Sequence, residues 1–321
     1  MQPQKSFANK STLAVKTPRS PNSLAVIGTV AIDNIKTPFG VREKVFGGSA
    51  AYFSYAASFF TSVALVGVVG KDFPDEYRAV LKEHPIDLSH LQVVEGKTFS
   101  WKGFYEHDMN SAKTLETHLN VLTGFDPVLK FENKPPFIFL ANIDPHLQAK
   151  VLDQLEKPRL KFVAMDTMNY WIDSQRDALL KVMARVDAMV LNDGEARQLT
   201  GEANLIKAAR KIREWGPQYV IIKKGEHGVL ILGDNLFFAL PAYPLDGVFD
   251  PTGAGDSFAG GLMGYLASQG EVSFEAIKKA AAYGSMVASF AVEDFGLEKL
   301  RRIKRSDIEE RLDLFRKLSV F

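Results

Sequence analysis

The chain of 321 residues contains no cysteine, which excludes disulfides, a thiolate nucleophile and any metal site that needs thiolate ligands. It also has almost no net charge, because 39 lysine and arginine residues face 38 aspartate and glutamate residues. Without a basic excess there is no field to hold a polyphosphate backbone, so we expect no nucleic-acid partner. The lack of cysteine fits a reducing compartment, and we expect a cytoplasmic location.

Long apolar runs are also missing, and we therefore expect no membrane partner, since a span needs about 20 such residues. Residues 1–22 are rich in Lys, Ser, Pro, Asn and Gln, and their only apolar run is Leu13-Ala14-Val15. A secretory signal needs an apolar centre of roughly 7–15 residues, so this segment does not resemble one. We expect residues 1–22 to form a disordered tail and residues 23–321 to form one folded domain.

From residue 24 onward, short apolar segments alternate with helical patterns. Strands are predicted at 24–28, 63–67, 137–140, 162–165, 188–191, 219–223 and 229–232. Helices are predicted at 49–60, 72–82, 146–155, 173–185, 194–199, 205–215, 254–268 and 273–290. Asp72 is the expected cap of the second helix, and Ser306 begins a capping-box pattern for a last helix. This order predicts an α/β fold with a mostly parallel central sheet and helices on both faces.

Two segments depart from that alternation, at about 36–46 and 98–122. Both alternate apolar and polar residues, a pattern typical of a sheet with one solvated face. The second is divided by a polar turn near Asp108-Met109-Asn110. We interpret the two segments as a small β-sheet lid on the α/β domain.

The most informative stretch is DPTGAGDSFAGG at residues 250–261, which follows strand-like residues and opens a helix of small residues. Gly253 and Gly255 allow a sharp turn that directs backbone N–H groups outward at the helix start, where the dipole also favours an anion. Asp256 then falls in the first turn. A carboxylate there can accept a proton from a hydroxyl that attacks a phosphoryl group.

This string resembles the C-terminal signature of the ribokinase/PfkB carbohydrate kinases and matches it at every defined position. The resemblance extends over roughly residues 24–300 and implies a ribokinase-like fold, with ATP and Mg²⁺ as cofactors. It implies that Asp256 is the catalytic base and that the amides of Gly253, Ala254 and Gly255 stabilise the transferring phosphoryl group.

The resemblance also places substrate residues. The string Gly28-Thr29-Val30-Ala31-Ile32-Asp33 is similar to the family's G-x-x-x-x-D, which implies that Asp33 binds substrate hydroxyls. A carboxylate suits this task because its two oxygens can accept from vicinal hydroxyls. Gly47 and Gly48 resemble the glycine pair against which the substrate packs. Asn142 and Asp144 fall where the family has a strand-end pair near the substrate.

On the cofactor side, Asn192-Asp193-Gly194-Glu195 resembles the family's N-x-x-E motif, so Asn192 and Glu195 are expected near Mg²⁺, with Glu195 acting through water. The stretch 223–228 resembles the nucleotide loop, which implicates its Lys223, Gly225 and Gly228. Many members hold a monovalent cation such as K⁺. Here Asp250 and Thr252, together with carbonyls near residues 295–296, are the corresponding candidates.

Two positions depart from the family pattern. Tyr52 stands where members often have an Asn that contacts the sugar, and Ala31 stands where ribokinases proper have another Asn. Because hydroxyl specificity depends on buried polar partners, these losses argue against ribose in its usual pose.

These observations predict an ATP-dependent phosphotransferase that acts on a hydroxymethyl group of a small sugar. One alternative is a nucleoside kinase of the same fold, and another is a catalytically silent regulator that binds a sugar or nucleotide. The family resemblance also makes a homodimer through the lid an expectation.

Overall fold

The computed structural model describes residues 23–107, 109, 112–155 and 159–319. The tail predicted at residues 1–22 and part of the predicted turn at Asp108-Met109-Asn110 lie outside the described residues. Within these ranges, no helix has both the length and the apolar character needed to cross a membrane.

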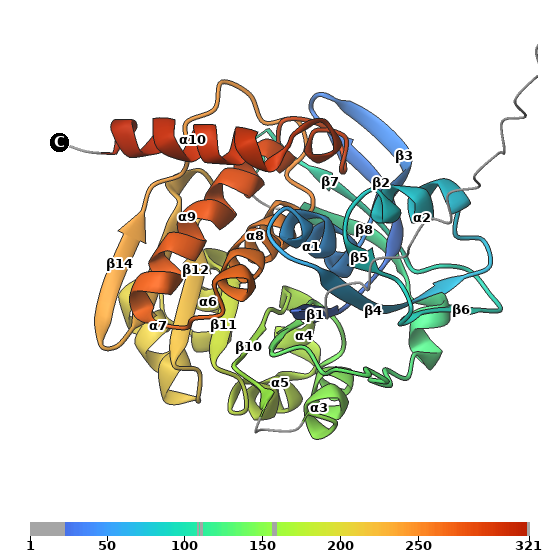
Figure 1. Cartoon of the computed structure of the whole chain (residues 1–321), viewed down its shortest axis with the longest axis horizontal. Helices are drawn as coiled ribbons and strands as arrows, with labels where there is room; N and C mark the ends of the chain where they lie inside the picture. Colours follow the sequence, from blue (N-terminus) through green and yellow to red (C-terminus); the bar gives the residue numbers. More distant parts are fainter. Residues whose placement is uncertain (1–22, 108, 110–111, 156–158, 320–321) are drawn as a thin grey trace, which may run out of the picture.

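The large sheet has the strand order β14-β13-β12-β11-β10-β9-β1-β4-β5, with β6 also paired to β4 (Figure 1). Its strands are β1 (Leu24–Ile27), β4 (Val63–Gly70), β5 (Ile86–Asp87), β6 (Leu91–Val94), β9 (Phe137–Leu140), β10 (Phe162–Met165), β11 (Ala188–Asn192), β12 (Tyr219–Lys223), β13 (Val229–Gly233) and β14 (Leu236–Leu240). Among the described strands of this large sheet, only the pairs β12–β13 and β13–β14 are antiparallel. The predicted mostly parallel sheet is confirmed.

Helices cover both faces of this sheet, as predicted. Leu24 and Val26 of β1 belong to one buried cluster, whereas Ala25 and Ile27 belong to another, because successive strand residues point to opposite faces. The first cluster packs against α1 (Ser49–Ser58), α2 (Asp75–Lys82), α8 (Ala254–Gln269), α9 (Phe274–Ala291) and α10 (Arg305–Leu318). The second packs against α3 (Pro145–Asp153), α4 (Asn169–Ser174), α5 (Arg176–Met183), α6 (Asp193–Thr200) and α7 (Leu205–Glu214).

A separate small sheet lies beside the large one, with the order β3-β2-β7-β8. It consists of β2 (Ala31–Thr37), β3 (Gly40–Gly47), β7 (Ser100–Tyr105) and β8 (Ala112–His118). β2 and β7 are parallel, and the other two pairs are antiparallel. β2 begins at Ala31, four residues after the end of β1 at Ile27, so the small sheet is connected by a short segment to the centre of the large one.

Two predicted helix starts were wrong. Pro74, not Asp72, is the N-cap of α2, because the Asp72 carboxylate accepts the N–H and the hydroxyl of Thr98 at 2.8 and 2.7 Å. The last helix begins at Arg305, and the Asp307 carboxylate accepts the N–H of Lys304 at 2.6 Å. In both cases the carboxylate accepts hydrogen bonds from groups that the capping pattern in the sequence did not identify, Thr98 for Asp72 and Lys304 for Asp307.

The contact between α1 and α8 depends on glycine. A Cβ at Gly264 would lie 2.7 Å from the carbonyl oxygen of Ala57, and a Cβ at Gly260 would lie 2.4 Å from that of Phe53. Because these neighbours are backbone atoms, they cannot rotate away as a side chain can. The close approach brings the first turn of α8 against the first turns of α1.

We expect Gly264→Ala to lower the free energy of unfolding by about 1–3 kcal/mol, the usual cost of overpacking a close helix contact. Urea unfolding followed by circular dichroism measures the change. Gly124→Ala is the matched control, because a Cβ at Gly124 would have no neighbour within 4 Å. A Gly264→Ala variant as stable as this control would contradict the packing described.

Candidate active site

The first turn of α8 is built on glycine. Gly253, its N-cap, has a left-handed φ of 74°. A Cβ at this position would lie 2.4–2.5 Å from ring atoms of Tyr52, so the turn packs directly against this aromatic ring and has no room for a side chain. The N–H of Ala254 donates to the carbonyl of Pro251 at 3.1 Å, and the positive end of the helix dipole adds to the field at this turn.

Asp256 and Lys223 meet at this helix start. Asp256 lies in the first turn of α8, and Lys223 is the last residue of β12. A Cβ at Gly255 would lie 2.6 Å from Lys223 Nζ, so the absence of a side chain there lets the ammonium group approach the turn. Burial raises the pKa of Asp256, and the positive charge of Lys223 opposes that rise.

Asp166 joins this group, although the sequence analysis did not single it out. It follows β10 directly and is buried, and burial together with the charge of Asp256 raises its pKa well above the usual range. The Oδ1 atom of Asp166 and the hydroxyl of Thr167 are buried without a hydrogen-bond partner among the described residues. The sequence feature that could have identified it is its position directly after the apolar run 162–165, at the expected end of a buried strand.

Asn192 and Glu195 hold each other at the start of α6. Asn192 Oδ1 accepts the N–H of Glu195, and Glu195 Oε2 accepts the N–H of Asn192, both at 2.8 Å. Glu195 is buried, which raises its pKa, while Lys223 lowers it. The capping arrangement fixes the carboxyl group within the electrostatic reach of Lys223 and Asp256.

Asp33 comes from β2 of the small sheet and is buried. Its carboxylate accepts the N–H of Trp101 at 3.2 Å and a second backbone hydrogen bond from Gly48. A Cβ at Gly47 would lie 2.1 Å from Asp33 Oδ2, so glycine leaves the room that the carboxylate occupies. Burial raises the pKa of Asp33 to about 7, and nearby carboxylates contribute to the rise.

Asp250 organises the segment before α8. It is fully buried, and it accepts the N–H of Thr252 at 2.9 Å and that of Gly296 at 3.1 Å. Burial raises its pKa. The Tyr52 hydroxyl is buried nearby and has no hydrogen-bond partner in the part of the chain that the structure describes. The predicted cation candidates are thus brought together with Gly296.

Asn142 and Asp144 have different neighbours. The side chain of Asn142 accepts the indole N–H of Trp171 at 3.0 Å and donates to the sulfur of Met168 at 3.2 Å. Asp144 is the N-cap of α3 and accepts the N–H of His146 at 2.8 Å. The structure therefore gives Asp144 a helix-capping contact, whereas Asn142 faces residues that follow β10.

Gly225 and Gly228 flank a single 3₁₀ turn between β12 and β13. Both have positive φ, 53° and 82°. A Cβ at Gly228 would lie 2.0 Å from the carbonyl oxygen of Leu240, so this glycine permits the turn to cross the end of β14. The turn begins two residues after Lys223 and continues the same edge of the sheet.

The donors fit Mg²⁺ in type. Mg²⁺ prefers oxygen ligands, keeps several waters and needs only one or two carboxylates. Asp166 offers a buried carboxyl oxygen without a partner, and Glu195 lies within its electrostatic reach. Across the described ranges, no group of three or more His, Cys, Asp or Glu side chains is close enough to form an all-protein metal cage.

The chain belongs to the pfkB family of carbohydrate kinases, whose family model matches residues 22–301. The predicted family and the ribokinase-like fold are confirmed. Its relatives include the cytidine kinase of Thermococcus kodakarensis, which is 34% identical over 246 residues, covering 75% of this chain and 88% of that protein.

Solved structures show the same fold. The nucleoside kinase of Methanocaldococcus jannaschii, an archaeal member of the ribokinase family, superposes with a TM-score of 0.73 at 20% identity, covering 92% of this chain and 100% of that one. A protein described as ribokinase II from Escherichia coli, solved with ATP and Mg²⁺, gives a TM-score of 0.75 at 18% identity, with coverages of 91% and 99%.

The raised pKa of Asp33 predicts how stability changes with pH. Because its pKa is about 7 in the folded chain against 3.8 without the fold, the folded state keeps a proton that the unfolded chain has released. The free energy of unfolding of the wild type should therefore fall, relative to that of Asp33→Asn, as pH rises from about 4 to about 7. Urea unfolding at stepped pH measures both. A constant difference across this window would contradict the buried, proton-retaining carboxyl.

Proposed function

We propose that this chain transfers the γ-phosphoryl group of ATP to the hydroxymethyl oxygen of a nucleoside. Two kinds of observation support the proposal. Asp256, Lys223 and the α8 start form a phosphoryl-transfer arrangement, in which a carboxylate lies beside a positively charged helix end. The similarity to a cytidine kinase and to a nucleoside kinase favours the nucleoside as acceptor.

Asp256 is the proposed general base. In its ionised form the carboxylate accepts the proton of the substrate hydroxyl while that oxygen forms a bond to the γ-phosphorus, and the bond from phosphorus to the β,γ-bridging oxygen breaks to release ADP. Burial raises the pKa of Asp256, and Lys223 favours the ionised form. The ammonium group therefore opposes protonation of the base.

The developing negative charge would be met by groups of this chain. The N–H groups of Gly253 and Gly255 lie at the positive end of the helix, and Lys223 Nζ lies beside the same turn, whereas the N–H of Ala254 already donates to Pro251. Mg²⁺ would be held by Asp166 and by Glu195 through water. When bound, it would neutralise charge on the triphosphate oxygens.

Asp33 would hold the acceptor. Its carboxylate oxygens are suited to the vicinal hydroxyls of a ribose, and the carboxylate is held in the room left by Gly47 and by a backbone hydrogen bond from Gly48. Asn142 follows β9, and its backbone carbonyl accepts the Ser49 hydroxyl at 3.2 Å while its side chain accepts the indole N–H of Trp171 at 3.0 Å. The ATP base and ribose would lie along the turn of Gly225 and Gly228, and a K⁺ ion near Asp250 and Thr252 would brace the α8 start.

The small sheet would act as a lid that excludes water, since hydrolysis would otherwise consume ATP. Residues of this sheet and of its β2–β3 turn already touch the segment before α8 and the segment after α9. The Thr252 hydroxyl donates to Tyr105 of β7 at 3.3 Å, the ring of Phe39 lies 5.1 Å from that of Phe249, and the guanidinium of Arg42 lies 4.7 Å from the ring centre of Phe295.

A free sugar is the second candidate acceptor, supported by the carbohydrate-kinase description of the family. The residue that distinguishes the two is Tyr52. A sugar-contacting Asn at this position would offer an amide to a hydroxyl, whereas the Tyr52 ring packs under Gly253. The acceptor therefore loses one polar partner, which weakens recognition of a small sugar more than that of a nucleoside with additional surface.

Asp256→Asn should lower kcat by about 10²–10⁴, the scale of losing a general base, while leaving the fold and ATP affinity nearly unchanged. Asp246→Asn is the matched control, because it makes the same substitution at an exposed position. Coupled detection of ADP measures turnover, and circular dichroism checks the fold. Turnover of Asp256→Asn within a few-fold of the control would overturn the assigned base.

The acceptor is tested by kcat/KM for cytidine, uridine, adenosine, inosine, ribose and fructose with Mg·ATP. We expect a nucleoside to give the highest value, by at least about tenfold over either sugar, because a hydroxyl-matching site rejects acceptors that leave its polar groups unpaired. A sugar that exceeds every nucleoside would refute the nucleoside and favour the second candidate.

A further inference from the structure

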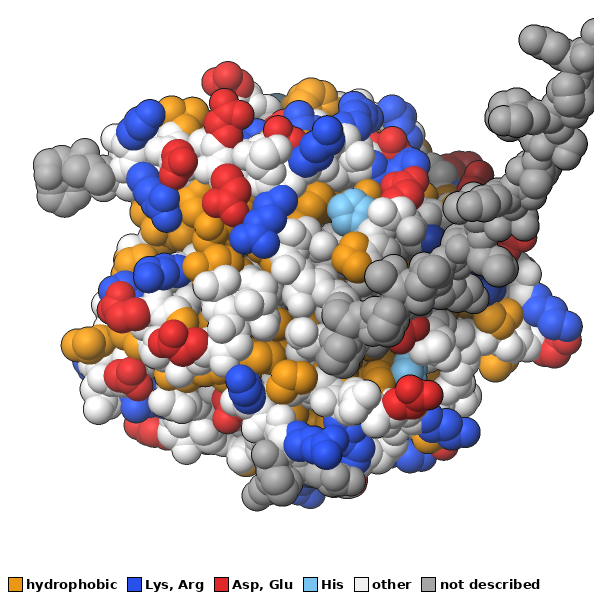
Figure 2. All heavy atoms as spheres, viewed as in Figure 1, with side chains coloured by type: hydrophobic (Ala, Val, Ile, Leu, Met, Phe, Trp, Pro, Cys, Tyr) orange, Lys and Arg blue, Asp and Glu red, His pale blue; other side chains and the backbone are white. Residues whose placement is uncertain are grey.

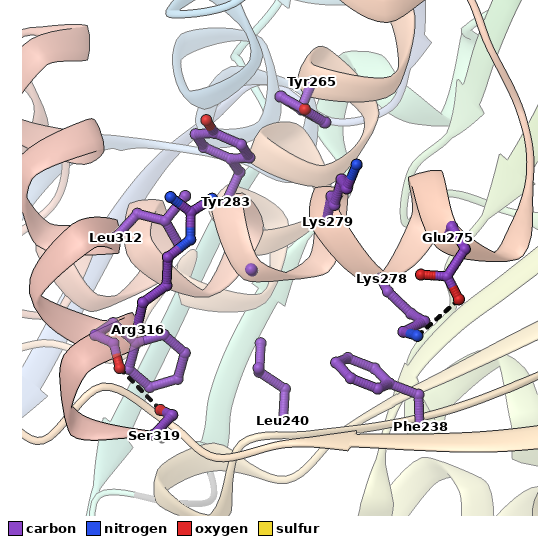
Figure 3. Close-up of a pocket in the computed structure, with 12 residues that line it drawn as sticks. Phe238, Leu240, Tyr265, Glu275, Lys278, Lys279, Tyr283, Leu312, Arg316 and Ser319 are labelled. Carbon is purple, nitrogen blue, oxygen red and sulfur yellow. Dashed lines mark hydrogen bonds and ion pairs between the residues drawn. The ribbon is translucent and has the colours of Figure 1, made fainter. Parts of the chain in front are cut away.

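A cavity of about 310 Å³ lies between β14, α9 and α10 (Figure 3). Tyr265 of α8 also lines it. Tyr265 is nine residues from Asp256, which at 1.5 Å per residue corresponds to about 14 Å along the helix. The cavity thus faces the opposite end of α8 from the phosphoryl-transfer site, and its volume is at the lower end of the about 300–1,000 Å³ typical of ligand pockets.

Aromatic and aliphatic side chains form its walls. Leu312 and Phe315 of α10 and Tyr283 of α9 are buried beneath it, and Phe238 and Leu240 come from β14. The rings of Tyr265 and Tyr283 stack with centroids 4.2 Å apart and planes inclined by 20°. In the space-filling view, hydrophobic side chains gather between α10 and α9, with Lys and Arg side chains beside them (Figure 2). Such walls suit a planar ring.

Three basic side chains surround these walls, namely Lys278, Lys279 and Arg316. The acidic residue in the lining is Glu275, which pairs with Lys278 at 2.8 Å, so three cations against one anion leave an excess of +2. Arg316 also pairs with Asp313 at 2.8 Å, but its side chain is 64% exposed and such a pair contributes little.

Lys279 differs from the other two. Among the residues that the structure describes, its ammonium group makes no ion pair or hydrogen bond, and in Figure 3 it extends beside Tyr265 at the rim. Lys278 instead lies over the ring of Phe238, 5.1 Å from its centre. The rim therefore holds an unpaired ammonium and a guanidinium from two different helices, on either side of an apolar floor.

From these features we propose that this cavity is a second binding site, for a small anion that joins a planar ring to a phosphate group, the chemistry of a nucleotide. A phosphate monoester carries a charge of about −1.5 to −2 at pH 7, opposite in sign to the excess of the lining residues. The ring packs against Tyr283, Leu240 and Phe238, the phosphate meets Arg316, and Lys279 adds positive charge on the other side of the floor. The proposal does not depend on which acceptor the kinase phosphorylates.

Hydrogen–deuterium exchange of the full chain, with AMP as the probe, reports each site separately. We expect AMP to slow exchange in the peptides of 305–318 and 274–284, in addition to any effect at the α8 start. Arg316→Glu should raise the AMP concentration needed for half-maximal protection of α10 by about tenfold or more. The reason is that it replaces a charge-assisted hydrogen bond with repulsion. Lys279→Glu should act in the same direction.

Lys317→Glu is the matched control, because it makes the same charge reversal on the adjacent, exposed residue of α10 and is outside the cavity lining. It should retain the AMP protection. Adenosine or inorganic phosphate alone, at equal concentration, should protect less than AMP. The second site would be overturned if AMP did not protect α10, or if phosphate alone protected it equally. It would also be overturned if Lys317→Glu and Arg316→Glu lost the same protection. A kinase assay on the same samples tests the proposed function independently.

Discussion

The start of α8 is the point on which the candidate site depends. Tyr52 fills the space below Gly253 and Lys223 fills the space beside Gly255, so neither glycine could carry a side chain without displacing one of them. The start of α8 and the ammonium group of Lys223 bring positive charge into a region with several buried carboxyl groups, namely those of Asp33, Asp166, Glu195 and Asp250. Burial raises the pKa of Asp256, and the positive charge of Lys223 offsets part of that rise.

Parallel pairing explains why the other polar groups collect at the same edge. Neighbouring strands β9, β10, β11 and β12 run in one direction, so their carboxyl ends lie side by side. Asn142 and Asp166 lie just beyond the first two of these strands, and Asn192 and Lys223 are the last residues of the other two. Each strand thereby contributes one polar residue to the candidate site, and the flanking helices bury the strands and fix these positions.

Much of this arrangement follows from local sequence, because apolar segments and the glycine-rich string locate the strands and the α8 start. Contacts between distant segments do not follow. The substitution at Tyr52 is visible in the sequence, but its packing under Gly253 joins residues far apart in the chain. Asp166 was missed because no motif marks it, although it directly follows the buried strand β10. Asp72 was assigned as a cap because the two donors of Thr98 could not be foreseen.

The position of Asp33 in the small sheet has an evolutionary consequence. Its carboxylate is held by backbone groups of the small sheet and of the Gly47-Gly48 turn, whereas Asp256 and Lys223 belong to the large sheet and its helices. On the proposed function, recognition of the acceptor and transfer of phosphate are therefore encoded in separate structural units that meet at a seam. Substitutions in the small sheet can alter which molecule is accepted while the reacting geometry is inherited intact, which is one route by which a single fold serves both sugars and nucleosides.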